Sequence, residues 1–127
     1  MIAVAIIALL AALIVPSFRK VRMKAQLTSC ASNCKNLGTI LETYSVDYDG
    51  KYPDLGGLAG LQQLIDHGNL GRLPNCPAAG QCTFTDYQST ANPNGYSFTC
   101  VGLFHTELTG AAGFPQYVAG LGLTERP

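Results

Sequence analysis

Residues 1–26, MIAVAIIALLAALIVPSFRKVRMKAQ, join a long apolar run to a short basic one. No charged side chain precedes Arg19, and four basic side chains then follow within six residues: Arg19, Lys20, Arg22 and Lys24. As a helix, residues 1–18 would extend roughly 27 Å, close to the thickness of a bilayer core. The stretch therefore predicts an apolar helix that needs either lipid or other apolar helices around it.

Three kinds of segment fit an apolar run of this length: a membrane helix, a cleavable secretory signal and a helix buried by protein. A secretory signal opens with positive charge and then becomes apolar, whereas here the charges follow the apolar run. Pro16 lacks a backbone donor and crowds the preceding turn, so it predicts a bend or a local weak point. We interpret the run as an anchor helix that is weakened near Pro16.

Charge and cysteine content give conflicting indications of the compartment. The basic residues would hold everything after them in the cytoplasm under the positive-inside rule. Five cysteines in 127 residues instead favour an oxidising compartment. A leader that carried the orienting charges would reconcile the two, so we expect a processed precursor whose start lies before Met1.

Length and charge distribution predict one small domain with a basic stem and an acidic head. Residues 1–35 carry five basic and no acidic side chains, whereas residues 36–127 carry three basic and eight acidic ones. A head without a basic stripe argues against polyanion binding, so we expect no nucleic-acid partner. The two histidines lie far apart and no nucleophile motif is present, so we expect neither an enzyme nor a cofactor.

An apolar stripe at helical spacing crosses residues 27–48. Its steps alternate between three and four residues, which places all members on one face of a helix. No proline interrupts residues 17–52, so the helix is predicted to run from the anchor to about Tyr48, where Gly50 and Pro53 end it. We therefore divide the chain into a stem, residues 1–26, and a head, residues 27–127, that includes the amphipathic half of the helix. The stripe comprises Leu27, Cys30, Cys34, Leu37, Leu41, Tyr44 and Tyr48.

The second half of the chain predicts shorter elements. Residues 58–65 favour a short helix with Leu58, Leu61, Leu64 and Ile65 on one side, ending near Gly68. Residues 83–90 and 95–102 favour strands, and ANPNG between them predicts an antiparallel hairpin. Residues 104–127 predict a third short strand or an ordered loop rather than another helix. The fold class is α+β: a long N-terminal helix packed on a small antiparallel β-sheet head.

The cysteines are candidates for disulfides. A bridge between Cys76 and Cys100 is the expected pair, because it would close a loop of roughly 25 residues and contribute about 3 kcal/mol. Cys82 could pair with Cys34 or Cys30, although both of the latter lie on the apolar stripe and are equally consistent with simple burial. An odd number leaves one thiol free or bonded between subunits.

Metal binding has weaker support in the sequence. Asp47, Asp49 and Asp54 offer oxygen ligands for calcium but do not complete a calcium loop, so a solvated turn is the simpler interpretation. The cysteines with His67 or His105 lack the C-x-x-C spacing of zinc sites. We therefore predict no bound metal, and we place His67 in the last turn of its helix.

The chain resembles the type IV pilins and the pseudopilins of type II secretion. Residues 1–26 are similar to the family's N-terminal assembly segment, and CKNLGTILETYSVDYDGKYP, LPNCPAAG and YSFTC are similar to segments of its heads. Family members usually begin about half a dozen residues earlier, with an aromatic residue followed by a glutamate. Neither is present, so N-terminal processing, methylation and charge pairing are assigned to no residue of this chain.

The resemblance implies a structural subunit that waits in the bacterial inner membrane and then polymerises with itself into a helical, type IV pilus-like surface filament. It implies pilus or secretion assembly machinery as a partner. The alternatives are a pseudopilin in a periplasmic pseudopilus and a monomeric membrane-anchored binding domain. The basic band Arg19, Lys20, Arg22 and Lys24 would meet an acidic neighbouring head, at about 0–1 kcal/mol per contact. The expected filament core contains Ile2, Val4, Ile6, Ile7, Leu9, Leu10, Leu13, Ile14, Val15 and Pro16.

Overall fold

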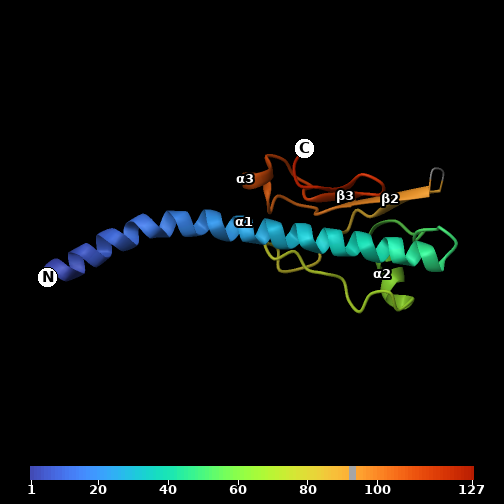
Figure 1. The fold of residues 1–127 in the computed structure, drawn as a ribbon, viewed down its shortest axis with the longest axis horizontal. Coiled ribbons are helices and arrows are strands. Elements are labelled where there is room, and N and C mark those ends of the chain that lie inside the picture. Colours follow the sequence, from blue (N-terminus) through green and yellow to red (C-terminus); the bar gives the residue numbers. More distant parts are fainter. Residues whose placement is uncertain (92–93) are drawn as a thin grey trace.

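The chain forms a long helix whose second half lies along a small head, while its first half projects alone (Figure 1). The structure is a computed structural model that describes residues 1–91 and 94–127, with the side chains of residues 15, 16 and 91 left out. The first helix, α1, spans Ile2–Asp47 without interruption. Both the predicted long helix and the α+β fold class are confirmed.

The head covers one face of the second half of α1. Leu27, Cys30, Cys34, Leu37, Leu41 and Tyr44 are all at most 6% exposed, as the spacing of the stripe predicts. Tyr48, the last member of the stripe, is instead 37% exposed, because α1 ends at Asp47 and Tyr48 lies beyond the last helical turn. The Tyr48 ring stacks on Tyr44 at 4.2 Å. Gly50, at φ 78°, then turns the chain away from the helix axis.

The second helix, α2, spans Gly57–Asp66 and packs its middle against the head core. Gly60, Leu61 and Leu64 are buried, whereas Leu58 is 47% exposed. The predicted inward position of Leu58 is therefore wrong, because the buried face of the helix lies about a third of a turn away from it. A Cβ atom at Gly60 would lie 2.6 Å from the Tyr87 ring, so only glycine permits this close approach.

The sheet contains β1 (Gln88–Ala91), β2 (Asn94–Thr99), β3 (Gln116–Val118) and β4 (Gly122–Thr124), in that spatial order. Each neighbouring pair is antiparallel, which confirms the predicted hairpin, although residues 92–93 of its connection lie outside the described residues. The C-terminal region forms two strands rather than one. It also contains a short helix, α3 (Thr106–Thr109), so the expectation of no further helix is wrong. Gly110, at φ 83°, ends α3 after a single turn.

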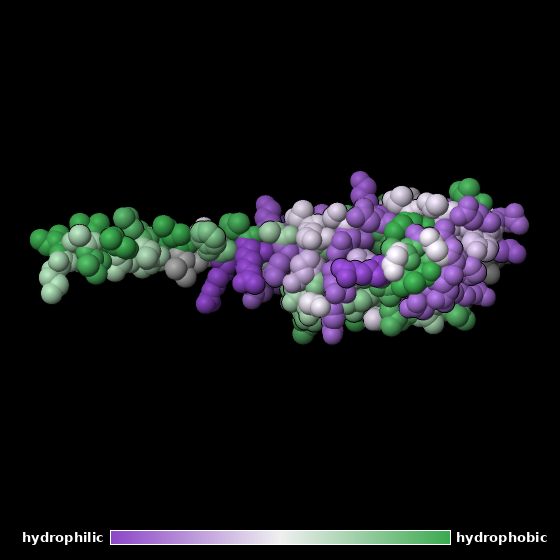
Figure 2. Space-filling view, turned by 90° about the horizontal axis from the view of Figure 1, so that it is seen from below, coloured by the Kyte–Doolittle hydropathy of each residue, from purple (hydrophilic) through white to green (hydrophobic). Residues whose placement is uncertain are grey.

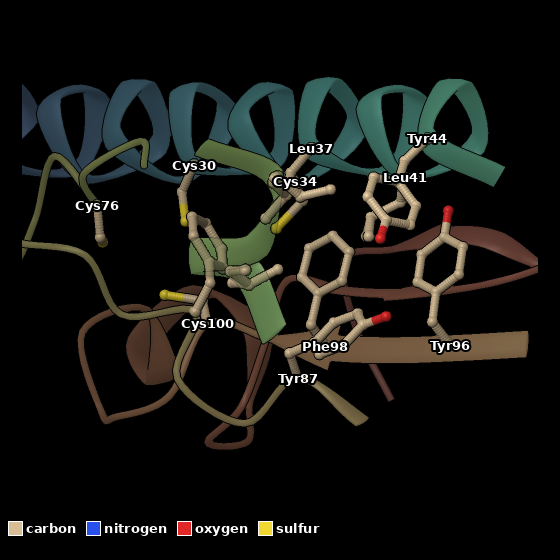
Figure 3. Packing of buried hydrophobic residues seen from close by; sticks show 13 residues of the cluster. Cys30, Cys34, Leu37, Leu41, Tyr44, Cys76, Tyr87, Tyr96, Phe98 and Cys100 are labelled. Carbon is tan, nitrogen blue, oxygen red and sulfur yellow. The ribbon is translucent and has the colours of Figure 1, made fainter. Parts of the chain in front are cut away.

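Aromatic side chains fill the space between α1 and the sheet (Figure 3). Tyr117 stacks with Tyr96 at 6.0 Å and with Phe98 at 5.7 Å between ring centroids. The Tyr96 hydroxyl donates to the carbonyl oxygen of Gly38 at 3.1 Å and to Glu42 Oε1 at 3.0 Å. These contacts hold the sheet close to α1 at Gly38, where a side chain would strike the Tyr117 ring.

Candidate functional site

The projecting half of α1 exposes an apolar surface, and Figure 2 shows one face of it. Every described side chain from Met1 to Arg22 is exposed. This helix is long and apolar enough to span a membrane. The predicted core residues Val15 and Pro16 have side chains outside the described residues. The others are each more than half exposed: Ile2, Val4, Ile6, Ile7, Leu9, Leu10, Leu13 and Ile14.

A basic band separates this apolar surface from the head. Arg19, Lys20, Arg22 and Lys24 are all exposed, and purple side chains gather at this level in Figure 2. The first buried residue, Leu27, follows within one helical turn of Lys24. Charge and apolar surface are thus presented next to each other on one continuous helix.

The three aspartates considered for calcium lie around the turn that follows α1. Asp47 Oδ2 accepts a hydrogen bond from Asn69 at 3.2 Å, and Asp54 Oδ1 accepts one from Gln63 at 2.9 Å. The Gln63 hydrogen bond holds the pKa of Asp54 below its usual value. Within the part of the chain that the structure describes, these carboxylates do not form a group of converging metal ligands.

His67 lies at this end of the head as well. It is the C-cap residue of α2, and its Nδ1 atom is 2.7 Å from the Tyr48 hydroxyl. Its ring also meets Tyr48 edge to face at 5.0 Å. His67 therefore belongs to a local aromatic contact and is not a member of the cysteine group described next.

Three cysteines and one histidine meet inside the head, close to the stem. The cysteine group consists of Cys30, Cys76, Cys100 and His105, all buried, and their sulfur and nitrogen atoms lie within 4.8 Å of one another. Cys76 Sγ is 3.4 Å from His105 Nε2. Figure 3 shows Cys30 reaching down from α1 towards Cys100, with Cys76 on the adjacent loop.

Hydrogen bonds from α1 fix the position of Cys76. The Gln26 amide donates to the carbonyl oxygen of Pro77 at 3.4 Å, and the Asn33 amide donates to that of Asn75 at 3.0 Å. These two contacts lie on either side of Cys76 in the sequence. The loop also closes on itself, because Cys76 N donates to Gln81 O at 2.9 Å. Cys76 is thereby held against the turn of α1 that carries Cys30.

The other two members of the cysteine group are placed by the sheet and by α3. Cys100 directly follows β2, and its backbone N–H donates to Pro115 O at 3.0 Å. Thr83 Oγ1 lies 3.0 Å from Cys100 Sγ. His105 caps α3, and its carbonyl oxygen accepts from the backbone N–H of Thr109 at 3.0 Å. Backbone contacts therefore position each of these side chains from outside the group.

Burial favours the uncharged forms of three members of the cysteine group, His105, Cys100 and Cys30. It lowers the pKa of His105. The hydrogen bond with Cys30, followed by burial, raises the pKa of Cys100. Cys100 acts to lower the pKa of Cys30, but Cys34 and burial outweigh that effect and raise it. These shifts favour neutral thiols at Cys30 and Cys100 and a neutral imidazole at His105.

All five cysteines are free thiols in this structure. Cys76 and Cys100 do lie close together, and the disulfide predicted between them stays a prediction. Cys34 is buried near Pro115, and Cys82 is partly buried outside the cysteine group. Sequence reasoning considered His105 with the cysteines but set the combination aside because the C-x-x-C spacing is missing. The short separation of His105 from Cys100, just after a predicted strand, was the available signal.

Comparison of the chain with protein-family models, with curated proteins and with solved structures gives no match. Its function must therefore be inferred from the exposed stem, the basic band and the buried cysteine group.

Proposed function

We propose that this protein is a structural subunit that polymerises through its N-terminal helix into a type IV pilus-like surface filament. The observation that carries the proposal is the contrast between the two halves of α1. Residues 27–44 bury one face against the head, whereas the apolar side chains before Arg19 project free of it (Figures 1 and 2). An apolar surface of this extent needs a partner.

Lipid and neighbouring stems are the two environments that can cover such a helix. Before assembly the stem would lie in the bacterial inner membrane, and after assembly it would lie in a bundle of identical stems. Five alanines leave room for close contact between helices, as small residues do in membrane interfaces. These are Ala3, Ala5, Ala8, Ala11 and Ala12.

The basic band and the acidic head supply an ordering contact between subunits. An open helical array needs two different, complementary surfaces on each subunit. Arg19, Lys20, Arg22 and Lys24 are exposed at the end of the stem, and all eight acidic residues of the chain lie in the head. Exposed ion pairs of this kind contribute about 0–1 kcal/mol each, so they set register while apolar burial provides the stability.

A charge placed in the stem tests the proposal. Ala8→Asp would introduce an unpaired carboxylate into the bundle and is expected to abolish fibres while the head stays folded. Ala59→Asp is the matched control, because Ala59 is exposed on α2 and lies outside the stem. Fibre yield from sheared cells and circular dichroism of the purified chain measure the two effects.

Wild-type fibre yield from Ala8→Asp would contradict the proposal. The location of the fibres distinguishes the two filament hypotheses, because surface fibres indicate a pilus and fibres confined to the periplasm indicate a pseudopilus. A wild-type chain that stays monomeric in detergent and in the membrane would instead indicate an anchored binding domain.

A further inference from the structure

Thiolate sulfur and imidazole nitrogen are ligands that soft metal ions prefer. The cysteine group offers three cysteine sulfur atoms and one histidine nitrogen. We propose that Cys30, Cys76, Cys100 and His105 bind one Zn²⁺ ion in a closed structural site. This inference stands on the head alone and does not depend on filament formation.

The distances between the ligand atoms fit a single small ion. Zn–S bonds of about 2.3 Å and Zn–N bonds of about 2.0–2.1 Å at tetrahedral angles place the ligand atoms about 3.6–3.8 Å apart. The four atoms already lie within 4.8 Å of one another, and Cys76 Sγ and His105 Nε2 are at 3.4 Å. Shifts of about 1 Å or less would complete the tetrahedron.

The chemistry of the ligands selects zinc. Three cysteines with one histidine are a structural zinc set, whereas hard cations such as calcium and magnesium take oxygen ligands. Four protein ligands fill the tetrahedron, so no position stays open for a substrate. All four residues are buried, which also suits a structural role.

Binding converts the three thiols into thiolates, and their protons pass to solvent. The resulting site carries one net negative charge inside the head. Thr83 Oγ1, at 3.0 Å from Cys100 Sγ, is placed to donate a hydrogen bond to that thiolate. The second coordination shell therefore contains a donor where the added charge appears.

The position of the site gives the ion a mechanical role. Its ligands come from α1, from the loop before β1, from the end of β2 and from the start of α3. Cys30 lies one helical turn beyond Leu27, the first residue of α1 that the head buries. Zinc would thus fasten three separate segments of the head to the helix at the point where the stem leaves it.

A disulfide between Cys76 and Cys100 is the competing state of the same residues. It would remove two of the four ligands, so the two states exclude each other. Elemental analysis of the full chain, purified in detergent micelles with a thiol reductant and without chelator, measures the zinc that the free thiols hold, and mass spectrometry of the alkylated protein counts those thiols. Intact mass after purification without reductant shows which state forms on its own.

Matched cysteine variants test which residues hold the ion. We expect one zinc per chain in the wild type and in Cys82→Ser, and background zinc in Cys100→Ser and His105→Ala. Cys82 is the control because its replacement also removes one thiol, but from outside the cysteine group. Equal zinc content in all four proteins would overturn the proposal. A wild-type chain that lacks zinc and instead contains a Cys76–Cys100 disulfide would also overturn it.

Two measurements on the wild type remain informative if the ligand variants fail to fold. Addition of Co²⁺ to the metal-free chain should give the visible absorption of a tetrahedral site with sulfur-to-cobalt charge transfer. Chelation should lower the Tm of the head by at least about 10 °C, and added Zn²⁺ should restore it. An octahedral cobalt spectrum, or a Tm that chelation leaves unchanged, would overturn the assignment.

Discussion

The Sγ atom of Cys76 lies 3.4 Å from Nε2 of His105, although 29 residues separate them in the sequence. The contact forms because α1 holds the Cys76 loop through Gln26 and Asn33, while His105 is the N-cap residue of α3. The helix that carries the stem thus also organises the interior of the head. Substitutions at the helix–sheet contact, in the cysteine group and in the stem should therefore have separate effects on stability, on zinc binding and on filament assembly, respectively.

Gly38→Ala should destabilise the head even though alanine favours helix more than glycine does. The added Cβ atom would lie 2.5 Å from Tyr117 Cζ, and the Tyr117 ring is held in a stack with Tyr96 and Phe98. We expect a loss of about 1–3 kcal/mol in the free energy of unfolding, measured by urea denaturation. Thr39→Ala, at the exposed neighbouring position, should have a much smaller effect. A more stable Gly38→Ala variant would show that the sheet does not approach α1 this closely.

Thr83→Val should weaken zinc binding without abolishing it. The substitution keeps the size of the side chain but removes the hydroxyl that lies 3.0 Å from Cys100 Sγ. Loss of an outer-shell partner typically lowers metal affinity about 10–100-fold. Competition with a chromophoric chelator measures this change, and Thr85→Val, at an exposed position, is the control. Equal affinities for the two variants would mean that Thr83 does not support the ion.

Alkaline pH should unfold the head. Burial raises the pKa of Tyr87, and burial together with the hydrogen bond to Glu42 raises the pKa of Tyr96. Both stay protonated in the folded state, whereas tyrosines of the unfolded chain ionise near their usual pKa of about 10. The contribution of these two side chains to stability is therefore retained below about pH 10 and lost above it, by about 1.4 kcal/mol per pH unit for each group.

Urea denaturation across this pH range measures the loss. Tyr87→Phe should make the decline of stability with pH shallower, because it removes one of the ionisable groups whose pKa is raised in the folded state. A free energy of unfolding that stays constant well above pH 10 would contradict the burial of these hydroxyls.

High salt should leave assembled filaments intact. Screening weakens exposed contacts made by Arg19, Lys20, Arg22 and Lys24, each worth only about 0–1 kcal/mol, but it does not weaken apolar burial of the stem. Sedimentation of fibres at low and high ionic strength measures the effect, while mild detergent should disperse them. Dissociation by salt alone would show that charge, not apolar contact, holds the subunits together.

Local patterns in the sequence predicted the helix and the hairpin because one periodicity governs each. The three- and four-residue steps from Leu27 to Tyr44 identified the buried face of α1 correctly. The same steps continued to Tyr48, where the helix had already ended, so periodicity alone placed that ring wrongly. The prediction for Leu58 was wrong for a related reason, since apolar character did not reveal which face of a short helix would pack against the head core.

The cysteine group was beyond local reasoning because its members are distant in the sequence. Cys30 and Cys76 are brought together by hydrogen bonds between α1 and a loop, which leave no repeat or motif. The C-x-x-C spacing of many zinc sites is missing, so the sequence predicted no zinc site. The sequence did not distinguish His105 from His67 as a partner of the cysteines, and only the fold places the start of α3 beside Cys76.

Imaging of native fibres tests the central claim, that this chain polymerises through its stem, most directly. Fibres sheared from the cells that make this protein are examined by electron cryomicroscopy, and their polypeptide is identified by mass spectrometry. We predict fibres built from this chain, with the apolar residues before Arg19 bundled at the axis and the heads outside. Absence of such fibres, with the chain retained in the envelope as a monomer, or fibres whose stems lie in solvent, would contradict the account.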